Sequence, residues 1–218
     1  MARRPRAETM QENRQRLMAA ARKAFAEKGY AAASMDELTA DVGLTRGALY
    51  HNFGDKRGLM AAVVHQIDAE MAAEARRIAE STAPGWPALL AEGEAYIAMA
   101  LRPEVQRIVL LDGPAVLGDP SKWPSQDSCL HATRDAVDAL IADGTLLALD
   151  PEAMARMLTG AALNAALWVA ASDQPDLVLP RAVVAFRQLA TGFLAKPGPG
   201  LAPTRSGPQI RGLRTTSP

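Results

Sequence analysis

The sequence predicts an all-α fold, and three observations support this expectation. Apolar residues make up 49% of the 218 residues and aromatic residues only 5%. The apolar share is therefore largely Ala and Leu, which favour helices over strands. Apolar side chains recur every three or four residues, the spacing of amphipathic helices. No useful length of sequence alternates apolar and polar residues as a half-buried strand does. One or two domains are expected at this length.

The cysteine and histidine content argues against two kinds of stabilising site. Cys129 is the only cysteine, so no disulfide can form within the chain. His51, His65 and His131 are too widely spaced to resemble metal ligands. We therefore expect a reduced, cytoplasmic protein without metal or cofactor. Export and membrane insertion are not expected, because no secretory signal is present and the apolar stretch 161–171 is too short to span a bilayer.

Charge is distributed unevenly along a chain whose formal net charge is zero. Residues 1–58 carry 11 basic and 7 acidic side chains, a net charge of +4, whereas residues 59–195 carry 9 and 17, a net charge of −8. From Lys196 onward there are four basic side chains and no acidic one. This asymmetry indicates that the N-terminal part contacts a polyanion. The alternative is that exposed helix faces simply differ in charge.

The chain begins with a basic arm, residues 1–7, that is expected to be disordered. A helix is predicted over 8–28, because apolar residues there recur with helical spacing, and Gly29 is placed to end it. Ser34 can cap the next helix, and Glu37 three residues later completes a capping box.

Two short helices joined by a glycine turn follow Ser34. The first ends at Gly43, and Thr45 supplies an N-cap for the second, which ends at Gly54. This is the helix-turn-helix pattern, in which the second helix enters the major groove of DNA. The segment 8–55 is therefore expected to be a DNA-binding domain.

The remainder, residues 56–195, is expected to be a larger helical domain. A long helix begins at Lys56 and runs to about residue 81, before the Pro-Gly-Trp-Pro cluster at 84–87. Gly and Pro breakers separate further helices, predicted over 87–101, 103–117, 127–143, 151–172 and 179–194. Residues 196–218 are rich in Gly, Pro, Ser and Thr, a composition typical of a disordered tail.

Short motifs within residues 17–60 follow one another in a specific order and spacing: Leu17-Met18-Ala19-Ala20-Ala21, Phe25-Ala26-Glu27-Lys28-Gly29-Tyr30, Asp36-Glu37-Leu38, Gly43-Leu44-Thr45-Arg46-Gly47-Ala48-Leu49-Tyr50-His51-Asn52-Phe53 and Lys56-Arg57-Gly58-Leu59. This region resembles the N-terminal domain of TetR-family transcriptional regulators. Ala33, where the family often has Thr, and Asp41-Val42, where a small or uncharged pair is more usual, depart from the pattern. The resemblance implies a DNA-binding head and a helical domain that dimerises and binds a small molecule.

The third helix carries the residues expected to read bases. Leu49 and Phe53 are spaced to face the core of the head, together with Leu38 and Phe25, which leaves the opposite face for DNA. Arg46 there can bind a guanine edge or a phosphate. Ala48 can touch a thymine methyl group, and Gly47 lets the backbone approach closely.

Further DNA contacts are implied by the resemblance and agree with side-chain chemistry, because hydroxyl, phenol, imidazole and ammonium groups all bind phosphate. The complete expected set is Ser34, Thr45, Arg46, Gly47, Ala48, Tyr50, His51 and Lys56. Tyr50 can alternatively cover the core of the head. The arginines of the arm, Arg3, Arg4 and Arg6, can follow phosphates or enter a minor groove, or stay solvated.

Specific binding through so small a head favours two half-sites, which implies a dimer on a palindromic operator with half-sites about 34–36 Å apart. The resemblance places the dimer interface on the last two helices, through Met154, Met157, Leu158, Ala161, Ala165, Val183, Phe186, Leu189 and Phe193. The alternative is that these apolar stripes belong to the protomer's own core.

An effector pocket is expected in the C-terminal domain, for a largely apolar small molecule. Its candidate residues are Tyr96, Met99, Arg107, Trp123, His131, Asn164 and Trp168, with Asp112 as a further polar point. Asn164 must find a hydrogen-bond partner if it is buried, either a ligand or another core group. A redox role for Cys129 is disfavoured, because the chain has no second cysteine to resolve an oxidised thiol.

These elements suggest a repressor that a ligand releases from DNA. The helix beginning at Lys56 links both domains, so a ligand that fits only one tilt of this helix would change the spacing of the two heads. One alternative is a DNA-binding or architectural protein without a ligand, which a fully packed C-terminal domain would favour. The other is an enzyme, although the sequence contains no Walker loop, dinucleotide-binding glycine pattern, zincin motif or serine elbow.

Overall fold

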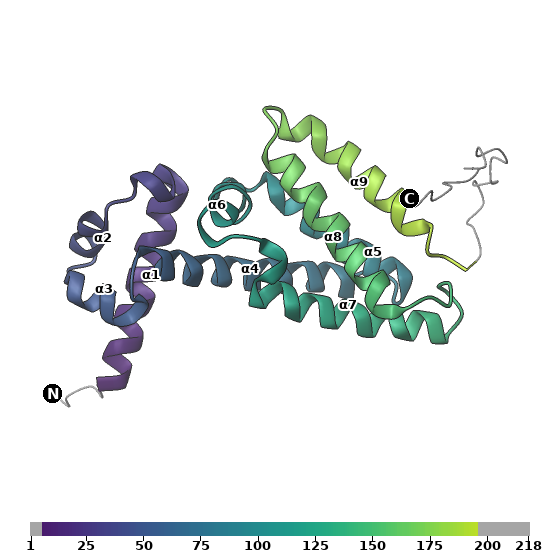
Figure 1. The fold of residues 1–218 in the computed structure, drawn as a ribbon, viewed down its shortest axis with the longest axis horizontal. Coiled ribbons are helices and arrows are strands. Elements are labelled where there is room, and N and C mark those ends of the chain that lie inside the picture. Colours follow the sequence, from purple (N-terminus) through teal and green to yellow (C-terminus); the bar gives the residue numbers. More distant parts are fainter. Residues whose placement is uncertain (1–5, 196–218) are drawn as a thin grey trace, which may run out of the picture.

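The computed structural model describes residues 6–195, which form a small N-terminal head and a larger helical body (Figure 1). The head consists of α1 (Arg6–Ala32), α2 (Met35–Asp41) and α3 (Arg46–Phe53), and α4 (Lys56–Glu80) runs from the head along the body. The remaining α-helices are α5 (Trp86–Ala98), α6 (Gly113–Leu117), α7 (Pro124–Ala142), α8 (Pro151–Ala170) and α9 (Pro175–Thr191). Three short elements, η1 (Met99–Leu101), η2 (Val105–Asp112) and η3 (Pro120–Lys122), connect them.

The all-α prediction is confirmed, because the described residues contain no strand beyond an isolated bridge between Leu146 and Leu194. One helix of this part of the chain, α8, also has the length and mean hydropathy of a membrane span. It packs against α5, α7 and α9 within the body.

Side-chain caps begin the short helices of the head where the sequence predicts them. Ser34 Oγ accepts a hydrogen bond from the Glu37 N–H at 3.4 Å, and Thr45 Oγ1 accepts one from the Ala48 N–H at 3.2 Å. The capping box forms on one side alone, because the Glu37 carboxylate pairs with Lys28 at 2.7 Å. The caps nevertheless fix the start of both helices.

The first helix differs from its prediction at both ends. Gly29 interrupts α1 with φ 78° and ψ 165°, as a helix-ending glycine does, but helical geometry resumes and continues to Ala32. At the other end, Arg6 and Ala7 belong to α1 and not to the expected arm. The rest of the arm, residues 1–5, and the predicted tail at 196–218 lie outside the described residues.

Two helices of the body also differ from the sequence prediction. The continuous helix expected over 103–117 is divided into a π-helix, η2, and α6. At the division the Gly113 N–H donates to Ile108 O, five residues back, and Pro114 has no N–H to continue an α-helical ladder. The last helix begins at Pro175 and not at 179, because proline suits the first helical position.

One apolar core runs from the head into the body. Leu38, Leu49 and Phe25 are buried in the head as predicted, and Phe53 packs half-buried against them. The same cluster continues along the inner face of α4. A second, smaller cluster, which contains Val137, closes the far end of the body. The head is therefore held to the body by continuous packing.

Candidate nucleic-acid interface and effector cavity

The helix α3 presents one polar face to solvent. Leu49 is completely buried, whereas Arg46, Gly47 and His51 are exposed on the face away from the core. Tyr50 is 52% exposed, so its ring does not cover the core of the head. Thr45 at the N-cap is also exposed and Ala48 is half-buried. The expected base-contacting segment is thus accessible to a duplex.

Arg46 forms an ion pair that the sequence analysis missed. Its Nε lies 2.6 Å from Asp36 Oδ1 at the start of α2, and both side chains are mostly exposed. An exposed pair of this kind contributes only about 0–1 kcal/mol to stability. The ion pair instead orients the Arg46 guanidinium on α3 through the Asp36 carboxylate on α2.

Two further residues of the expected contact set, Lys56 and Ser34, also have internal partners. Lys56 Nζ lies 4.6 Å from the centre of the Tyr30 ring and donates to Ala31 O at 3.3 Å. Ser34 is half-buried and caps α2. Ser34 and Lys56 lie close to the helix-turn-helix in the sequence. Their contact with DNA stays a prediction.

Arginines of α1 stabilise the carboxyl ends of both short helices. Arg14 donates to Asn52 O at 2.8 Å and its guanidinium lies 4.4 Å from the centre of the Phe53 ring. Arg16 donates to Val42 O. Cations at helix C-termini interact favourably with the helix dipole. Part of the basic excess in the N-terminal segment therefore serves the fold of the head and is not a DNA contact by itself.

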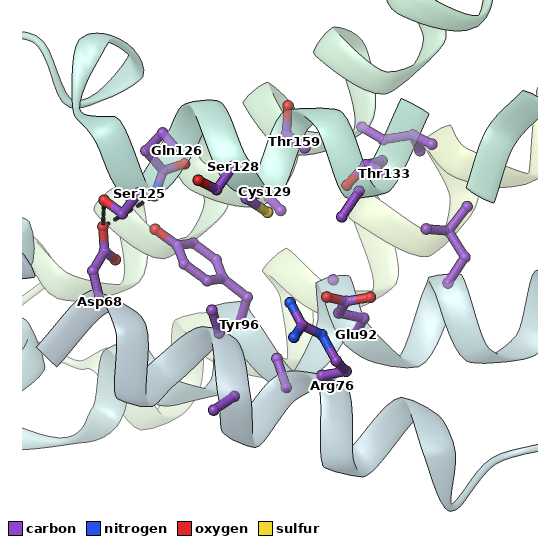
Figure 2. A pocket seen from close by; sticks show the side chains of 18 of the residues that line it. Asp68, Arg76, Glu92, Tyr96, Ser125, Gln126, Ser128, Cys129, Thr133 and Thr159 are labelled. Carbon is purple, nitrogen blue, oxygen red and sulfur yellow. Dashed lines mark hydrogen bonds between the residues drawn. The ribbon is translucent and has the colours of Figure 1, made fainter. Parts of the chain in front are cut away.

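A cavity of about 310 Å³ lies within the body, between α4, α5, α7 and α8, with two side chains of α9 at its edge. Its apolar lining includes Trp86, Leu89, Leu90, Leu158, Ala162 and Phe186. Figure 2 shows its polar groups in two places: Asp68, Ser125, Gln126 and the Tyr96 hydroxyl gather at one end, and Arg76 and Glu92 lie apart from them.

The acidic groups of the cavity are poorly solvated. Asp68 is 3% exposed, and burial raises the pKa of its carboxyl although Ser125 and Gln126 donate hydrogen bonds to it. Burial also raises the pKa of Glu92, which the positive charge of Arg76 opposes. The pKa of the Cys129 thiol is raised by burial as well, so this cysteine stays a thiol at neutral pH.

The cavity includes one of the seven expected effector residues, Tyr96. The other six do not line it: Met99 and Trp123 are buried in the core, Arg107 lies at the head, and His131, Asn164 and Trp168 are exposed. The correction for Asn164 follows from helix phase, because Asn164 and Trp168 share the outer side of α8. Asn164 is therefore not the buried amide that the sequence analysis considered.

The cavity-lining groups that the sequence analysis missed are Asp68, Arg76, Glu92, Ser125, Gln126 and Thr159, among others. Asp68 alone carried a sequence signal, as an acid on the otherwise apolar side of a predicted helix between Val64 and Met71. The remaining polar residues come from several helices, and local patterns do not indicate that they meet.

Arg107 and Asp112 belong to a junction between head and body. The Tyr30 N–H donates to Asp112 Oδ2 at 2.7 Å, and Arg107 Nε lies 3.3 Å from the same oxygen. The Arg107 guanidinium rests against Gly29, where a Cβ atom would lie 2.1 Å from it. These contacts fix the end of α1 to η2.

A second part of this junction is formed by Arg22. Its guanidinium binds Glu104 at 2.8 and 2.6 Å and Glu70 at 2.8 Å, which joins α1 to the start of η2 and to α4. The two carboxylates raise the pKa of Arg22, and Arg22 lowers the pKa of Glu104. The head is thus attached to η2 and to α4, and α4 also lines the cavity.

The expected dimer residues divide into three groups. Met154, Leu158 and Phe186 are buried in the protomer, and Ala161, Ala165, Val183 and Phe193 are half-buried. Met157 and Leu189 are exposed, together with Trp168, Leu177 and Val184 of the same two helices. The outer faces of α8 and α9 therefore form an exposed apolar surface, which we call the α8–α9 face.

The comparisons with known proteins agree with a helix-turn-helix protein of this architecture. Residues 17–63 match the family described as bacterial regulatory proteins, tetR family, and residues 86–193 match the tetracyclin repressor-like C-terminal domain. The crystal structure of a TetR-family transcriptional regulator from Pectobacterium atrosepticum is 47% identical, with a TM-score of 0.81, over 89% of this chain and 100% of that chain.

Two groups of curated relatives are more distant. The transcriptional repressor AcnR of Corynebacterium glutamicum is 42% identical over 60 residues, 28% of this chain and 32% of that protein. The Tn10 TetC protein of Escherichia coli is 28% identical over 158 residues, 70% of this chain and 78% of that protein. The match to AcnR thus spans about a third of that repressor's length.

The fold and the exposed α3 define a helix-turn-helix regulator of transcription. The chain belongs to the TetR family of transcriptional regulators, since the Pectobacterium relative is 47% identical and the match covers 89% of this chain and all of that relative. The regulators of this family bind DNA and act as dimers.

Proposed function

We propose that this chain is a dimeric repressor that binds a palindromic operator through α3 and leaves it when a small molecule fills the cavity. The observation that carries the proposal is the course of α4. Its first residue, Lys56, contacts Tyr30 of the head, and Asp68 and Arg76 further along the same helix line the cavity. One rigid element therefore adjoins both sites.

The α8–α9 face supports the dimeric part of the proposal. Val184 of α9 is 66% exposed, and Trp168 of α8 is 44% exposed. A monomeric protein rarely exposes a large contiguous apolar surface, and such surfaces commonly mark protein interfaces. Gly160 on α8 has no atom within 4 Å of a Cβ position, so a second helix could approach closely there.

The junction supports the release part of the proposal. A ligand that displaces α4 or η2 would act on Arg22 through Glu70 and Glu104, and on Tyr30 through Asp112. Either displacement would rotate the head and change the distance between the α3 helices of a dimer. Since a ligand can shift an equilibrium only by its difference in affinity between two states, the cavity must differ between the DNA-bound and free forms.

A regulator without a small-molecule input is the second candidate, and the cavity argues against it. A fully packed body would favour that alternative, whereas about 310 Å³ inside this one is not filled by side chains. A DNA-binding regulator of either kind would act in the cytoplasm. The division into a DNA-binding domain over 8–55 and an effector domain over 56–195 remains part of this proposal.

The proposal is tested by selecting bound duplexes from a random pool with the full-length protein. We expect an enriched palindrome with half-sites about one helical turn apart, and weaker binding to it when a cavity ligand is added. Enrichment of a single half-site would argue against the dimeric reader. Ligands that fill the cavity and leave operator affinity unchanged would argue against release.

A further inference from the structure

Asp68 is a buried carboxylate that forms no ion pair with another side chain of the described residues. Both of its hydrogen-bond donors, Ser125 Oγ and Gln126 Nε2, bind the same atom, Oδ2. Among the ion pairs of residues 6–195, none includes Asp68. His65, one turn earlier on α4, makes a small electrostatic contribution that opposes the effect of burial on the pKa of Asp68. Since a buried charge is costly unless it is paired, Oδ1 is available for a cationic partner.

The Tyr96 hydroxyl is directed toward the same end of the cavity (Figure 2). It is buried, and no group of the described part of the chain meets hydrogen-bond geometry with it, although the Gln126 side chain is near enough to oppose the effect of burial on the pKa of Tyr96. Buried polar groups in native proteins nearly always have a partner, so an unpartnered hydroxyl beside an unpaired carboxylate indicates a missing polar group. The Tyr96 ring also offers an aromatic face, which attracts cations.

The rest of the cavity sets the remainder of the ligand. Arg76 and Glu92 have opposite charges and offset one another, so Asp68 determines the sign of the charge at the end that it shares with Ser125 and Tyr96. The walls around these groups are formed by Trp86, Leu90, Phe186 and several alanines. An anionic group would be repelled by Asp68, and a purely apolar molecule would leave Asp68 and Tyr96 unpaired.

We propose that the cavity binds a primary amine with an apolar body, whose ammonium group pairs with Asp68 and Tyr96. This inference rests on the proposed role of the cavity as the effector site. The ammonium supplies N–H donors for Asp68 Oδ1 and the Tyr96 hydroxyl oxygen. The apolar body lies against the walls, and about 310 Å³ accommodates a ring with a short alkyl chain.

Three probes of equal length test the charge of the ligand. Calorimetric titration of the full-length protein is made at neutral pH with 4-phenylbutylamine, 4-phenylbutan-1-ol and 4-phenylbutanoate. We expect the amine to bind roughly 10- to 100-fold more tightly than the alcohol, because a hydrogen bond to a buried charged group is worth that ratio, and the carboxylate to bind most weakly. An alcohol that binds as tightly as the amine, or a carboxylate that binds most tightly, would overturn the proposal, and so would the absence of binding by all three.

Two variants and a control assign the effect to the named groups. Asp68→Asn keeps the shape of the side chain and is expected to remove most of the preference for the amine over the alcohol. Tyr96→Phe is expected to lower the affinity for 4-phenylbutylamine by about tenfold or less. Glu80→Gln removes an equal charge from an exposed position of α4. It is expected to change neither the affinity for the amine nor that for the alcohol. A preference that survives Asp68→Asn would contradict the assignment.

The two proposals fail in different ways. Operator affinity is measured separately, by anisotropy of a labelled duplex with and without 4-phenylbutylamine. Binding of the amine with unchanged operator affinity supports the ligand class and contradicts release. Release by a neutral or anionic compound, without amine binding, contradicts the ligand class and leaves the repressor proposal standing.

Discussion

Gly47 lies on the exposed face of α3 with space around it. A Cβ atom at this position would have Thr45 Oγ1 as its nearest neighbour, at 3.6 Å, which is an ordinary van der Waals distance. Nothing in the head therefore requires glycine at this helical position, and glycine in a helix is less stable than alanine. The residue is explained if DNA approaches the backbone here.

Gly47→Ala is expected to raise the free energy of unfolding by about 0.5–1 kcal/mol and to weaken operator binding. The added methyl group restricts the unfolded chain and meets the duplex surface in the complex. Urea denaturation measures the first effect and duplex anisotropy the second. A stabilised variant with unchanged operator affinity would show that DNA does not approach α3 at Gly47.

Asp68 makes the stability of the body depend on pH. Burial raises the pKa of its carboxyl in the folded state, so the folded protein binds more protons than the unfolded chain between the ordinary pKa, about 3.9, and the raised one. The free energy of unfolding therefore falls as pH rises through this interval. The cost of the buried charge is absent below the interval and complete above it.

Asp68→Asn is accordingly expected to be more stable than the wild-type protein at neutral pH, because it removes the cost of the buried charge. The advantage should shrink as pH falls to about 4 and below, where Asp68 of the wild type becomes protonated in both states. Denaturation curves at a series of pH values measure the difference. A constant difference, or one that grows toward acid, would contradict the pKa direction.

The helix α3 depends on α1 for the position of its last turn. Arg14 of α1 donates to Asn52 O and covers the Phe53 ring, so the end of α3 is held by a side chain 38 residues earlier in the chain. This contact does not involve DNA. It nevertheless sets the direction in which α3 presents Arg46.

Arg14→Ala is expected to lower the free energy of unfolding by about 1–3 kcal/mol, through loss of the charged hydrogen bond and the cation–π contact. Lys23→Ala removes the same charge from an exposed position of α1 and is expected to change stability by less than about 0.5 kcal/mol. Thermal denaturation of both variants distinguishes the effects. Equal losses in the two variants would mean that the charge of α1, and not the anchoring of α3, matters.

Local signals predicted the head well. Ser34 and Thr45 act on N–H groups three residues away, so their caps can be recognised from sequence alone. The spacing of residues along α8 carries a further signal. Met157, Asn164 and Trp168 lie at intervals of seven and four residues, so the three share one face of α8, but only the structure shows that this face is exposed.

The cavity could not be predicted from local patterns. Asp68, Tyr96 and Ser125 come from three helices, and only the packing of α4, α5 and α7 brings them together. The polar residues chosen from sequence stood out within apolar runs, but Arg107 is used at the junction with the head. Net charge was also an incomplete guide, because several basic side chains of the N-terminal segment, Arg22 among them, bind partners inside the protein.

The assembly of two chains determines how firmly the protein holds DNA. In the proposed dimer, the α8–α9 faces pair and the two heads bind their half-sites together. The second head then binds as part of the same complex, at a high effective concentration. Loss of the dimer should therefore weaken DNA binding without any change in α3.

Val184→Arg places a charge on the α8–α9 face at a side chain that is 66% exposed, so the protomer should still fold. We expect light scattering to show monomers where the wild type forms dimers, and operator affinity to fall by roughly 100-fold or more. Ala139→Arg on the exposed side of α7 is the matched control and should remain dimeric. A Val184→Arg protein that stays dimeric would place the interface elsewhere.

Arg46, on the exposed face of α3, is proposed to read a base of the operator. The direct measurement is the affinity of the wild type and of Arg46→Ala for the selected palindrome and for each single-base substitution of one half-site. We expect Arg46→Ala to lose about 1–3 kcal/mol of binding free energy on the preferred duplex and to discriminate no longer between bases at one position. Unchanged discrimination at every position, or equal weakening on all duplexes, would contradict it.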